Sequence, residues 1–185
     1  MILAIDIGNT NIVIGCCDRE KIYFVERLST NNTKTELEYA ISFKNVLELY
    51  HINPKEIEGG IISSVVPPIT NIVRASAEKV LGKSVKIVGP GVKTGLNILM
   101  DNPAQVGSDR IVNAVAAINE YTAPLIIIDM GTATTFCVVD EKKNYIGGMI
   151  LPGVRISLDA LTAGTSQLSR ISIEAPKKII GKNTI

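Results

Sequence analysis

The chain has 185 residues, of which 46% are hydrophobic and 20% charged, a composition typical of globular proteins and unlike that of disordered or collagen-like chains. The 19 Lys and Arg residues nearly balance the 18 Asp and Glu residues, and no basic run is present, so nucleic acid is not an expected partner. No apolar stretch approaches the ~20 residues that span a bilayer, and the chain does not start with a basic segment. We therefore expect neither secretion nor membrane insertion.

The first half of the chain alternates between predicted strands and helices. Three strands are predicted over residues 1–6, 11–17 and 22–28. Thr33-Lys34-Thr35-Glu36 has the form of a capping box and predicts a helix that ends before Pro54. One face of this helix is expected to carry Leu37, Ala40, Ile41, Leu47 and Tyr50. A strand over 59–66, a helix entered at Pro67-Pro68 and a strand over 85–88 follow, and this alternation predicts a covered, partly parallel sheet.

The second half repeats the opening pattern. After a Gly/Pro-rich connection (89–95) and a helix that leads to Pro124, residues 125–132 resemble residues 3–10, with Asp129 matching Asp6 and Gly131 matching Gly8. A β-rich run, a charged turn and a third run follow each motif. These segments are residues 11–17, 18–21 and 22–28 in the first copy, and 134–139, 140–143 and 145–150 in the second. Two copies of a strand–loop–strand–turn–strand unit indicate a duplicated domain.

Each copy has an Asp-x-Gly turn directly after an aliphatic strand. Backbone N–H groups and hydroxyls of such a loop can approach an anion closely, as Asn9, Thr10 and Thr132 would. The carboxylates repel phosphate, so Asp6 makes sense chiefly as a holder of Mg²⁺. One Asp-Gly pair alone is more simply a hairpin turn, but the duplication favours two loops that grip a polyphosphate. The P-loop and dinucleotide fingerprints both fail on glycine spacing.

Asp109 and Arg110 stand side by side near the start of the predicted helix that precedes Pro124. Asp109 could accept a proton from an attacking hydroxyl, and Arg110 could hold an anionic group bidentately. A capping acid beside a surface arginine is the alternative. Gly147-Gly148 is either a plain glycine turn or a place where a flat nucleoside approaches the backbone. His51, the only histidine, is expected at the surface of a helix end rather than in catalysis.

The three cysteines indicate reduced thiols. Cys16 and Cys17 are adjacent, Cys137 lies in an apolar run, and no CxxC pair or nearby histidine accompanies them. We expect buried thiols of a cytoplasmic protein rather than a zinc site or a disulfide framework.

Four motifs, in order and spacing, resemble type III pantothenate kinases over nearly the whole chain. They begin at Asp6 (Asp-x-Gly-Asn-Thr-Asn), Gly107 (Gly-Ser-Asp-Arg), Asp129 (Asp-x-Gly-Thr-Ala) and Gly147 (Gly-Gly-x-Ile-x-Pro-Gly), and the segment 181–184 fits as well. The resemblance implies that ATP contacts Asp6, Ile7, Gly8, Asn9, Thr10, Asn11, Ile12, Val13 and Thr132. It also implies that Asp129 binds a monovalent cation, K⁺ or NH₄⁺.

The same resemblance implies the acceptor site. Gly107, Ser108, Asp109 and Arg110 would bind pantothenate, with Asp109 as the proton acceptor. Thr184 would reach pantothenate from the partner in a homodimer. Met100 stands near the place where the family usually has a tyrosine that helps enclose pantothenate. Family members continue beyond the position of Ile185 into a further helix and strands, so an incomplete second lobe is expected.

The sequence therefore predicts an α/β fold with two similar lobes of the actin-like ATPase (ribonuclease H-like) type, residues 1–116 and 117–185. ATP would lie between the lobes and pantothenate near Asp109, with in-line phosphoryl transfer as the chemistry. Two alternatives stay open. One is a non-catalytic ATP-binding regulatory protein of the same superfold, and the other is a kinase for a different small hydroxylated substrate.

Overall fold

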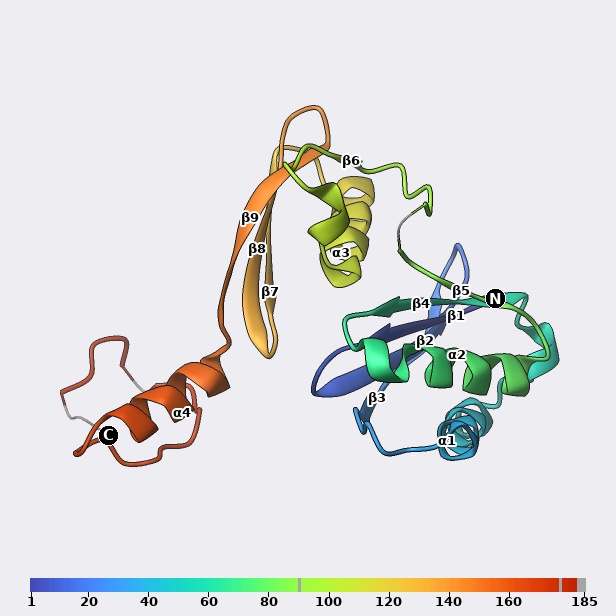
Figure 1. Ribbon diagram of the computed structural model, residues 1–185, viewed down its shortest axis with the longest axis horizontal. Coiled ribbons are helices and arrows are strands. Elements are labelled where there is room, and N and C mark those ends of the chain that lie inside the picture. The colour runs from blue at the N-terminus through green and yellow to red at the C-terminus, as the bar shows by residue number, and fades with distance from the viewer. Residues whose placement is uncertain (90, 177, 183–185) are drawn as a thin grey trace.

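The computed structural model describes residues 1–89, 91–176 and 178–182, which form two β-sheets with helices packed on them (Figure 1). The first sheet has the strand order β3-β2-β1-β4-β5. Its strands are β1 (Ile2–Ile7), β2 (Asn11–Cys17), β3 (Ile22–Ser29), β4 (Gly59–Ser64) and β5 (Val85–Ile87). β1 runs antiparallel to β2 and parallel to β4, which confirms the partly parallel sheet.

Two helices, α1 (Glu36–Leu49) and α2 (Pro67–Leu81), cover one face of this sheet (Figure 1). The core between them contains side chains from β1 that alternate inward along the strand, as its pleat requires. These fully or almost fully buried residues are Leu3, Ile5 and Ile7 of β1, Tyr39 and Phe43 of α1, and Ile69 and Val73 of α2.

The predicted start and buried face of α1 are both wrong in detail. The capping box is formed by Thr35 and Glu38, two residues later than predicted. The buried side chains on α1 are Tyr39, Ala40, Phe43, Val46 and Leu47, whereas Leu37 and Ile41 are at least half exposed. The reason is the helical repeat: Ala40, Phe43, Val46 and Leu47 follow Tyr39 by 1, 4, 7 and 8 residues and form one stripe, and Leu37 and Ile41 lie outside it.

The second sheet has the order β6-β9-β8-β7 and is covered on one face by α3 (Ser108–Glu120). Its strands are β6 (Asn97–Ile98), β7 (Leu125–Met130), β8 (Ala133–Val139) and β9 (Asn144–Pro152). Ala114 of α3 is buried together with Cys137, Val139 and Tyr145 of the sheet. The lobe boundary between residues 116 and 117 stays a prediction. Residue 116 lies within α3, and the second core includes side chains from Leu96 onward.

Equivalent turns join the second and third strands of the two repeated units. Asp18 accepts hydrogen bonds from the Tyr23 hydroxyl and two backbone N–H groups, which lower the pKa of Asp18 to about 2. Asp140 is bonded in the same manner by Asn144 and a backbone N–H, and its pKa is also lowered. Both turns are closed by an aspartate that bonds the backbone ahead of it, a frequent property of turn aspartates.

Two 3₁₀ turns and one further helix complete the described elements. Short 3₁₀ turns lie at Pro54–Glu56 and Pro103–Gln105. Helix α4 (Val154–Gly164) has no counterpart among the predicted elements, and it extends away from the second sheet (Figure 1). No helix among the described residues is both long and apolar enough to cross a membrane. His51 is exposed at the end of α1, as expected.

Candidate active site

The loop after β1 is held in a fixed shape by the end of β3. The Gly8 N–H donates to the Asn11 carbonyl at 2.9 Å, which closes the loop. The Thr30 hydroxyl donates to the Gly8 carbonyl at 2.6 Å, and the Thr30 N–H donates to the Thr10 carbonyl at 3.0 Å. This loop therefore has a fixed backbone while Thr10 stays exposed at its tip.

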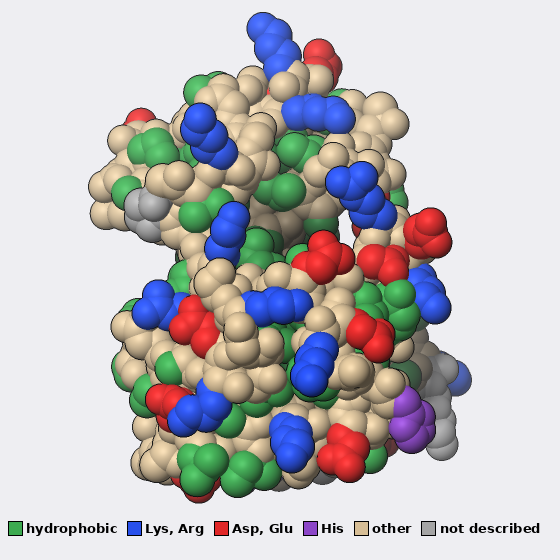
Figure 2. Space-filling model, turned by 90° about the vertical axis from the view of Figure 1, so that its right-hand side faces the viewer, with side chains coloured by type: hydrophobic (Ala, Val, Ile, Leu, Met, Phe, Trp, Pro, Cys, Tyr) green, Lys and Arg blue, Asp and Glu red, His purple; other side chains and the backbone are tan. Residues whose placement is uncertain are grey.

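The loop after β7 closes in the same way and meets the first loop. The Gly131 N–H donates to the Ala133 carbonyl at 3.0 Å. The hydroxyls of Thr10 and Thr132, 122 residues apart in sequence, are hydrogen-bonded at 2.8 Å. The prediction that the two loops face each other is thus confirmed. A space-filling view shows a hollow between the upper and lower parts of the molecule (Figure 2).

The N-terminus of α3 is attached to the end of β4. The Ser108 hydroxyl accepts from the Ser64 N–H at 3.0 Å and donates to the Ser64 carbonyl at 2.9 Å. A Cβ on Gly107, the residue before the helix, would collide with the Asp109 carboxylate, so a side chain there would displace Asp109. One turn further along α3, the Asn113 amide donates to the Asp129 carboxylate at 2.9 Å. Helix α3 therefore connects the end of β4 with the end of β7.

Two carboxylates, Asp109 and Asp129, act on that of Asp6 at this place. The pKa of Asp6 is raised, first because the surrounding protein removes part of its hydration, and further by the charges of Asp109 and Asp129. A hydrogen bond from Ser63 opposes the rise. Like charges near one another favour binding of a cation. No group of three or more His, Cys, Asp or Glu side chains in the described part of the chain is arranged to hold a metal by itself.

Arg110 does not match the alternative of a surface arginine. Its side chain is half-buried against the second sheet, where Nε donates to the Cys137 Sγ at 3.4 Å. Gly148 lies beside the same guanidinium and within β9, so the plain glycine turn predicted as one alternative for Gly147-Gly148 is wrong. A Cβ on Gly148 would meet the Phe136 carbonyl and Arg110 Nη2, whereas the space beside Gly147 is open, so the approach of a nucleoside to this segment stays a prediction.

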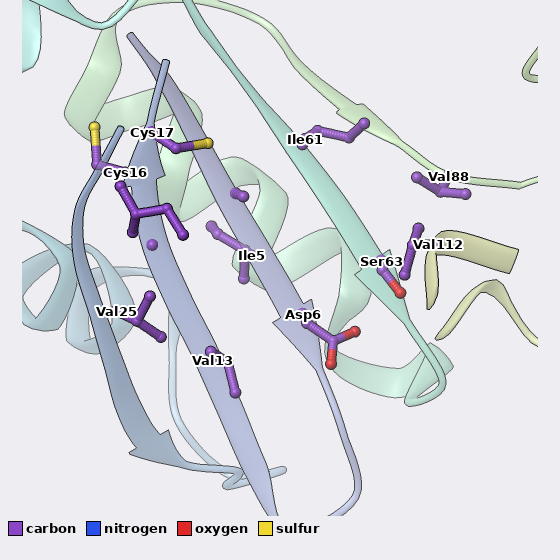
Figure 3. A pocket seen from close by; sticks show the side chains of 13 residues that line it. Ile5, Asp6, Val13, Cys16, Cys17, Val25, Ile61, Ser63, Val88 and Val112 are labelled. Carbon is purple, nitrogen blue, oxygen red and sulfur yellow. The ribbon is translucent and has the colours of Figure 1, made fainter. Parts of the chain in front are cut away.

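An apolar groove of about 320 Å³ runs along the face of the first sheet that α1 and α2 leave open. Figure 3 shows Asp6 and Ser63 at one end of it, near Val112 of α3, and Val25 and Cys17 toward the other end. Because its walls are almost entirely hydrocarbon, the groove offers few groups for phosphate. Only its Asp6 end belongs to the candidate site.

Comparison with known sequences gives the family. The family model for type III pantothenate kinase matches residues 2–185. The chain belongs to the type III pantothenate kinase family. Curated relatives with this name are 50% identical in Geobacillus sp. (strain WCH70), 49% in Halalkalibacterium halodurans and 48% in Exiguobacterium sp.. In each case the match includes all of this chain, and it covers 72, 73 and 73% of these relatives.

Solved structures agree on the fold. A conserved Baf family protein from Campylobacter jejuni is 19% identical with a TM-score of 0.53, over 95% of this chain and 68% of that one. The ethanolamine utilization protein EutJ from Carboxydothermus hydrogenoformans is 14% identical with a TM-score of 0.51, over 88% of this chain and 55% of that one. The two sheets have the actin-like ATPase arrangement that the family resemblance implies, and their paired loops agree with the predicted duplication.

Most residues that the family resemblance assigns lie around the two joined loops. Those at the loops or at the start of α3 are Asp6, Gly8, Asn9, Thr10, Asn11, Gly107, Ser108, Asp109, Arg110, Asp129 and Thr132. Ile7 and Ile12 are fully buried in the first core, so only their backbone can face a ligand, while Val13 lines the apolar groove. Met100 is half-buried against the second core. Thr184 lies outside the described residues.

Several residues of the site have no counterpart in the sequence predictions. Asn113 orients Asp129, and its position four residues after Asp109 is the signal that could have found it, since such residues share a helix face. Ser63 pairs in register with Asp6 across the parallel strands β1 and β4. Thr30, which fixes the first loop, has no such signal because the two segments meet only in the folded sheet.

Proposed function

We propose that this chain phosphorylates pantothenate with ATP to give 4′-phosphopantothenate, the first step of coenzyme A biosynthesis. Family membership supports this function. The observation that carries it is the direct contact of the two Asp-x-Gly loops through Thr10 and Thr132, with the start of α3 beside them. Two adjoining loops rich in backbone amides and hydroxyls suit a polyphosphate, and an acid next to them suits a hydroxyl acceptor.

The donor set at the joined loops fits Mg²⁺. Asp6 supplies a hard oxygen ligand whose ionisation is disfavoured first by its lost hydration and then by the charges of Asp109 and Asp129, and a bound cation would offset both. Mg²⁺ in phosphoryl-transfer sites is held by one or two carboxylates together with phosphate oxygens and waters, which agrees with a site that lacks three protein ligands. When bound, the ion would neutralise charge on the phosphates. Loop amides, Thr10 and Thr132 would contact the phosphate oxygens.

Asp109 and Arg110 would act on the acceptor. Asp109 takes the proton of the pantothenate hydroxyl as that oxygen bonds to the γ-phosphorus, and the bond to the ADP oxygen breaks. Arg110 holds the carboxylate of pantothenate with its planar fork of N–H groups. The Ser108 hydroxyl is already bonded to β4, so Ser108 would offer its backbone rather than its side chain.

Asp129 would bind the monovalent cation, K⁺ or NH₄⁺. Its carboxylate is oriented by Asn113 and lies at the second loop, where a cation would offset phosphate charge. Replacement of K⁺ by Na⁺ at fixed Mg²⁺ is expected to lower turnover. Equal rates in both salts would remove this role.

The acceptor site would be completed by a second subunit. This proposal rests on Thr184 and on the family resemblance, and it predicts that activity falls as the protein is diluted and dissociates. A fully active monomer in light scattering would rule out a shared site. A cytoplasmic location also stays a prediction, supported by the three free thiols.

The experiment that tests the function is Asp109→Asn in a coupled assay of ATP turnover with pantothenate. A positioned general base contributes about 10²- to 10⁴-fold, so turnover should fall by that order while ATP affinity stays nearly unchanged. Glu120→Gln, at the other end of α3, is the matched control and should keep wild-type turnover. Wild-type protein that binds ATP but phosphorylates neither pantothenate nor a panel of sugars and polyols would instead favour the regulatory alternative.

A further inference from the structure

The guanidinium of Arg110 packs against Cys137, Tyr145 and Gly148 of the hairpin formed by β8 and β9. These three residues are called the seat of Arg110. Besides the Nε hydrogen bond to Cys137 Sγ, the guanidinium lies over the Tyr145 ring, with 5.6 Å between its central carbon and the ring centroid. A Cβ on Gly148 would come within 2.7 Å of Arg110 Nη2. The Arg110 side chain thus donates to a sulfur, lies over an aromatic ring and fills space that a side chain on Gly148 would need.

The three seat residues are themselves held firmly. Cys137 and Gly148 are direct cross-strand partners, and the Phe136 carbonyl and Arg110 Nη2 occupy the place that a side chain on Gly148 would need. Cys137 is 2% exposed and Tyr145 is fully buried. The Tyr145 hydroxyl also donates to Cys137 Sγ, at 3.4 Å. The pKa of Tyr145 is raised, mainly by burial and then by this bond, so Tyr145 remains a protonated donor at neutral pH.

The seat uses one end of the Arg110 side chain and leaves the other available. Nε is occupied by Cys137, and among the described residues Arg110 forms no ion pair with an acidic side chain. The two terminal nitrogens are the atoms that bind a carboxylate bidentately. A free arginine must give up the rotamer entropy of its long side chain when it is fixed in one place. An arginine already held by its Nε and its flat face gives up less of this on binding an anion.

We propose that Cys137, Tyr145 and Gly148 are positioning residues that hold Arg110 ready for the carboxylate of the acceptor, and that they thereby make the site selective for an acid. This inference rests on the proposed function. It assigns acid selectivity to a hairpin of the second lobe, whose residues would act on the substrate only through Arg110.

The test compares pantothenate with pantothenol, in which an alcohol replaces the carboxylate. Cys137→Ala removes the acceptor of the Nε hydrogen bond and should raise KM for pantothenate about 5- to 10-fold, the size expected for a hydrogen bond to a charged group. Neither kcat, KM for ATP, nor the kinetics with pantothenol should change by more than about twofold, since none of them depends on this bond. Cys137→Ser keeps an acceptor and should restore part of the loss. Tyr145→Phe, which removes only the hydroxyl, should raise KM for pantothenate by a smaller factor.

Two controls separate positioning from general damage. Cys16→Ala makes the same change at a buried cysteine of the first sheet and should leave KM for pantothenate unchanged. In an Arg110→Met background, Cys137→Ala should have no further effect on KM, because the seat would have no arginine to position. The proposal is overturned if Cys137→Ala and Tyr145→Phe both keep the wild-type KM, or if KM for pantothenol rises equally. Wild-type protein that phosphorylates neither acceptor would overturn the proposed function, and this proposal with it.

Discussion

The first strands of the two repeated units, β1 and β7, have nearly the same side-chain pattern but opposite burial. Leu3, Ile5 and Ile7 of β1 are 0, 3 and 0% exposed. When Asp6 is aligned with Asp129, the matching residues of β7 are Ile126, Ile128 and Met130, which are 69, 54 and 71% exposed. In the first unit α1 and α2 cover this face, whereas in the second unit α3 packs on the opposite face.

The loops that follow these strands are much more alike than the faces. Each is closed by an N–H of its glycine, Gly8 or Gly131, bonded to a carbonyl of the next strand. This closure involves residues within three positions of one another, whereas burial depends on helices far away in sequence. The comparison therefore separates what a short motif determines from what its packing partners determine.

The sharpest way to test the equivalence of the two loops is to neutralise each aspartate in turn. Asp6→Asn should lower kinase turnover by roughly 100-fold or more, because it removes a ligand of the metal that neutralises phosphate charge. Asp129→Asn should cost less and should chiefly abolish the difference between K⁺ and Na⁺. Steady-state assays in both salts measure this. Identical losses in the two variants, each with the cation preference intact, would mean that the loops do not divide these roles.

Asp6→Asn should also change stability in the direction opposite to activity. The pKa of Asp6 is raised above its ordinary value of 3.8, so ionisation of Asp6 costs the folded state some stability. This cost is absent below the ordinary value and appears as pH rises through the folded-state pKa. The variant should therefore have a higher Tm than wild type at pH 7 and an equal Tm near pH 3. A lower Tm at pH 7 would contradict this sign.

Equivalent truncations in β1 and β7 test the contrast in burial. Ile5→Ala should lower the free energy of unfolding by about 2–5 kcal/mol, as expected for a cavity in a packed core. Ile128→Ala should cost less than about 1 kcal/mol, because the side chain is more than half exposed. Urea titrations followed by circular dichroism give both values. A comparable loss in Ile128→Ala would indicate that this face of β7 is covered in solution.

The smallest expected effect concerns the contact between the loops. Thr10→Val and Thr132→Val each remove one partner of the hydroxyl pair, whose net contribution should be about 0.5–1.5 kcal/mol. A double-mutant cycle of unfolding free energies isolates this coupling. Ser29→Ala, at the exposed end of β3, is a control that should couple to neither threonine. Zero coupling between Thr10 and Thr132 would indicate that the loops do not hold each other in solution.

The sequence by itself determined the elements and the duplication, since both depend on local signals. Short, mostly aliphatic runs predicted β1, β2 and β7, and the recurrence of Asp-x-Gly predicted two matching loops. It also placed Asp109 and Arg110 at the start of a helix, where the structure has them. The predicted cap of α1 lies two residues before the observed one, because Thr33 and Thr35 offer competing capping positions.

Only the tertiary structure decided which of these parts meet. Thr10 and Thr132, Asn113 and Asp129, and Ser63 and Asp6 are brought together by strand register and by the placement of α3. The same is true of the seat of Arg110, which joins one helix to two strands of a hairpin. Periodicity reports which face of an element is apolar, but it carries no information on which partner will cover that face. For this reason β1 and β7 could look alike in sequence and yet differ in burial.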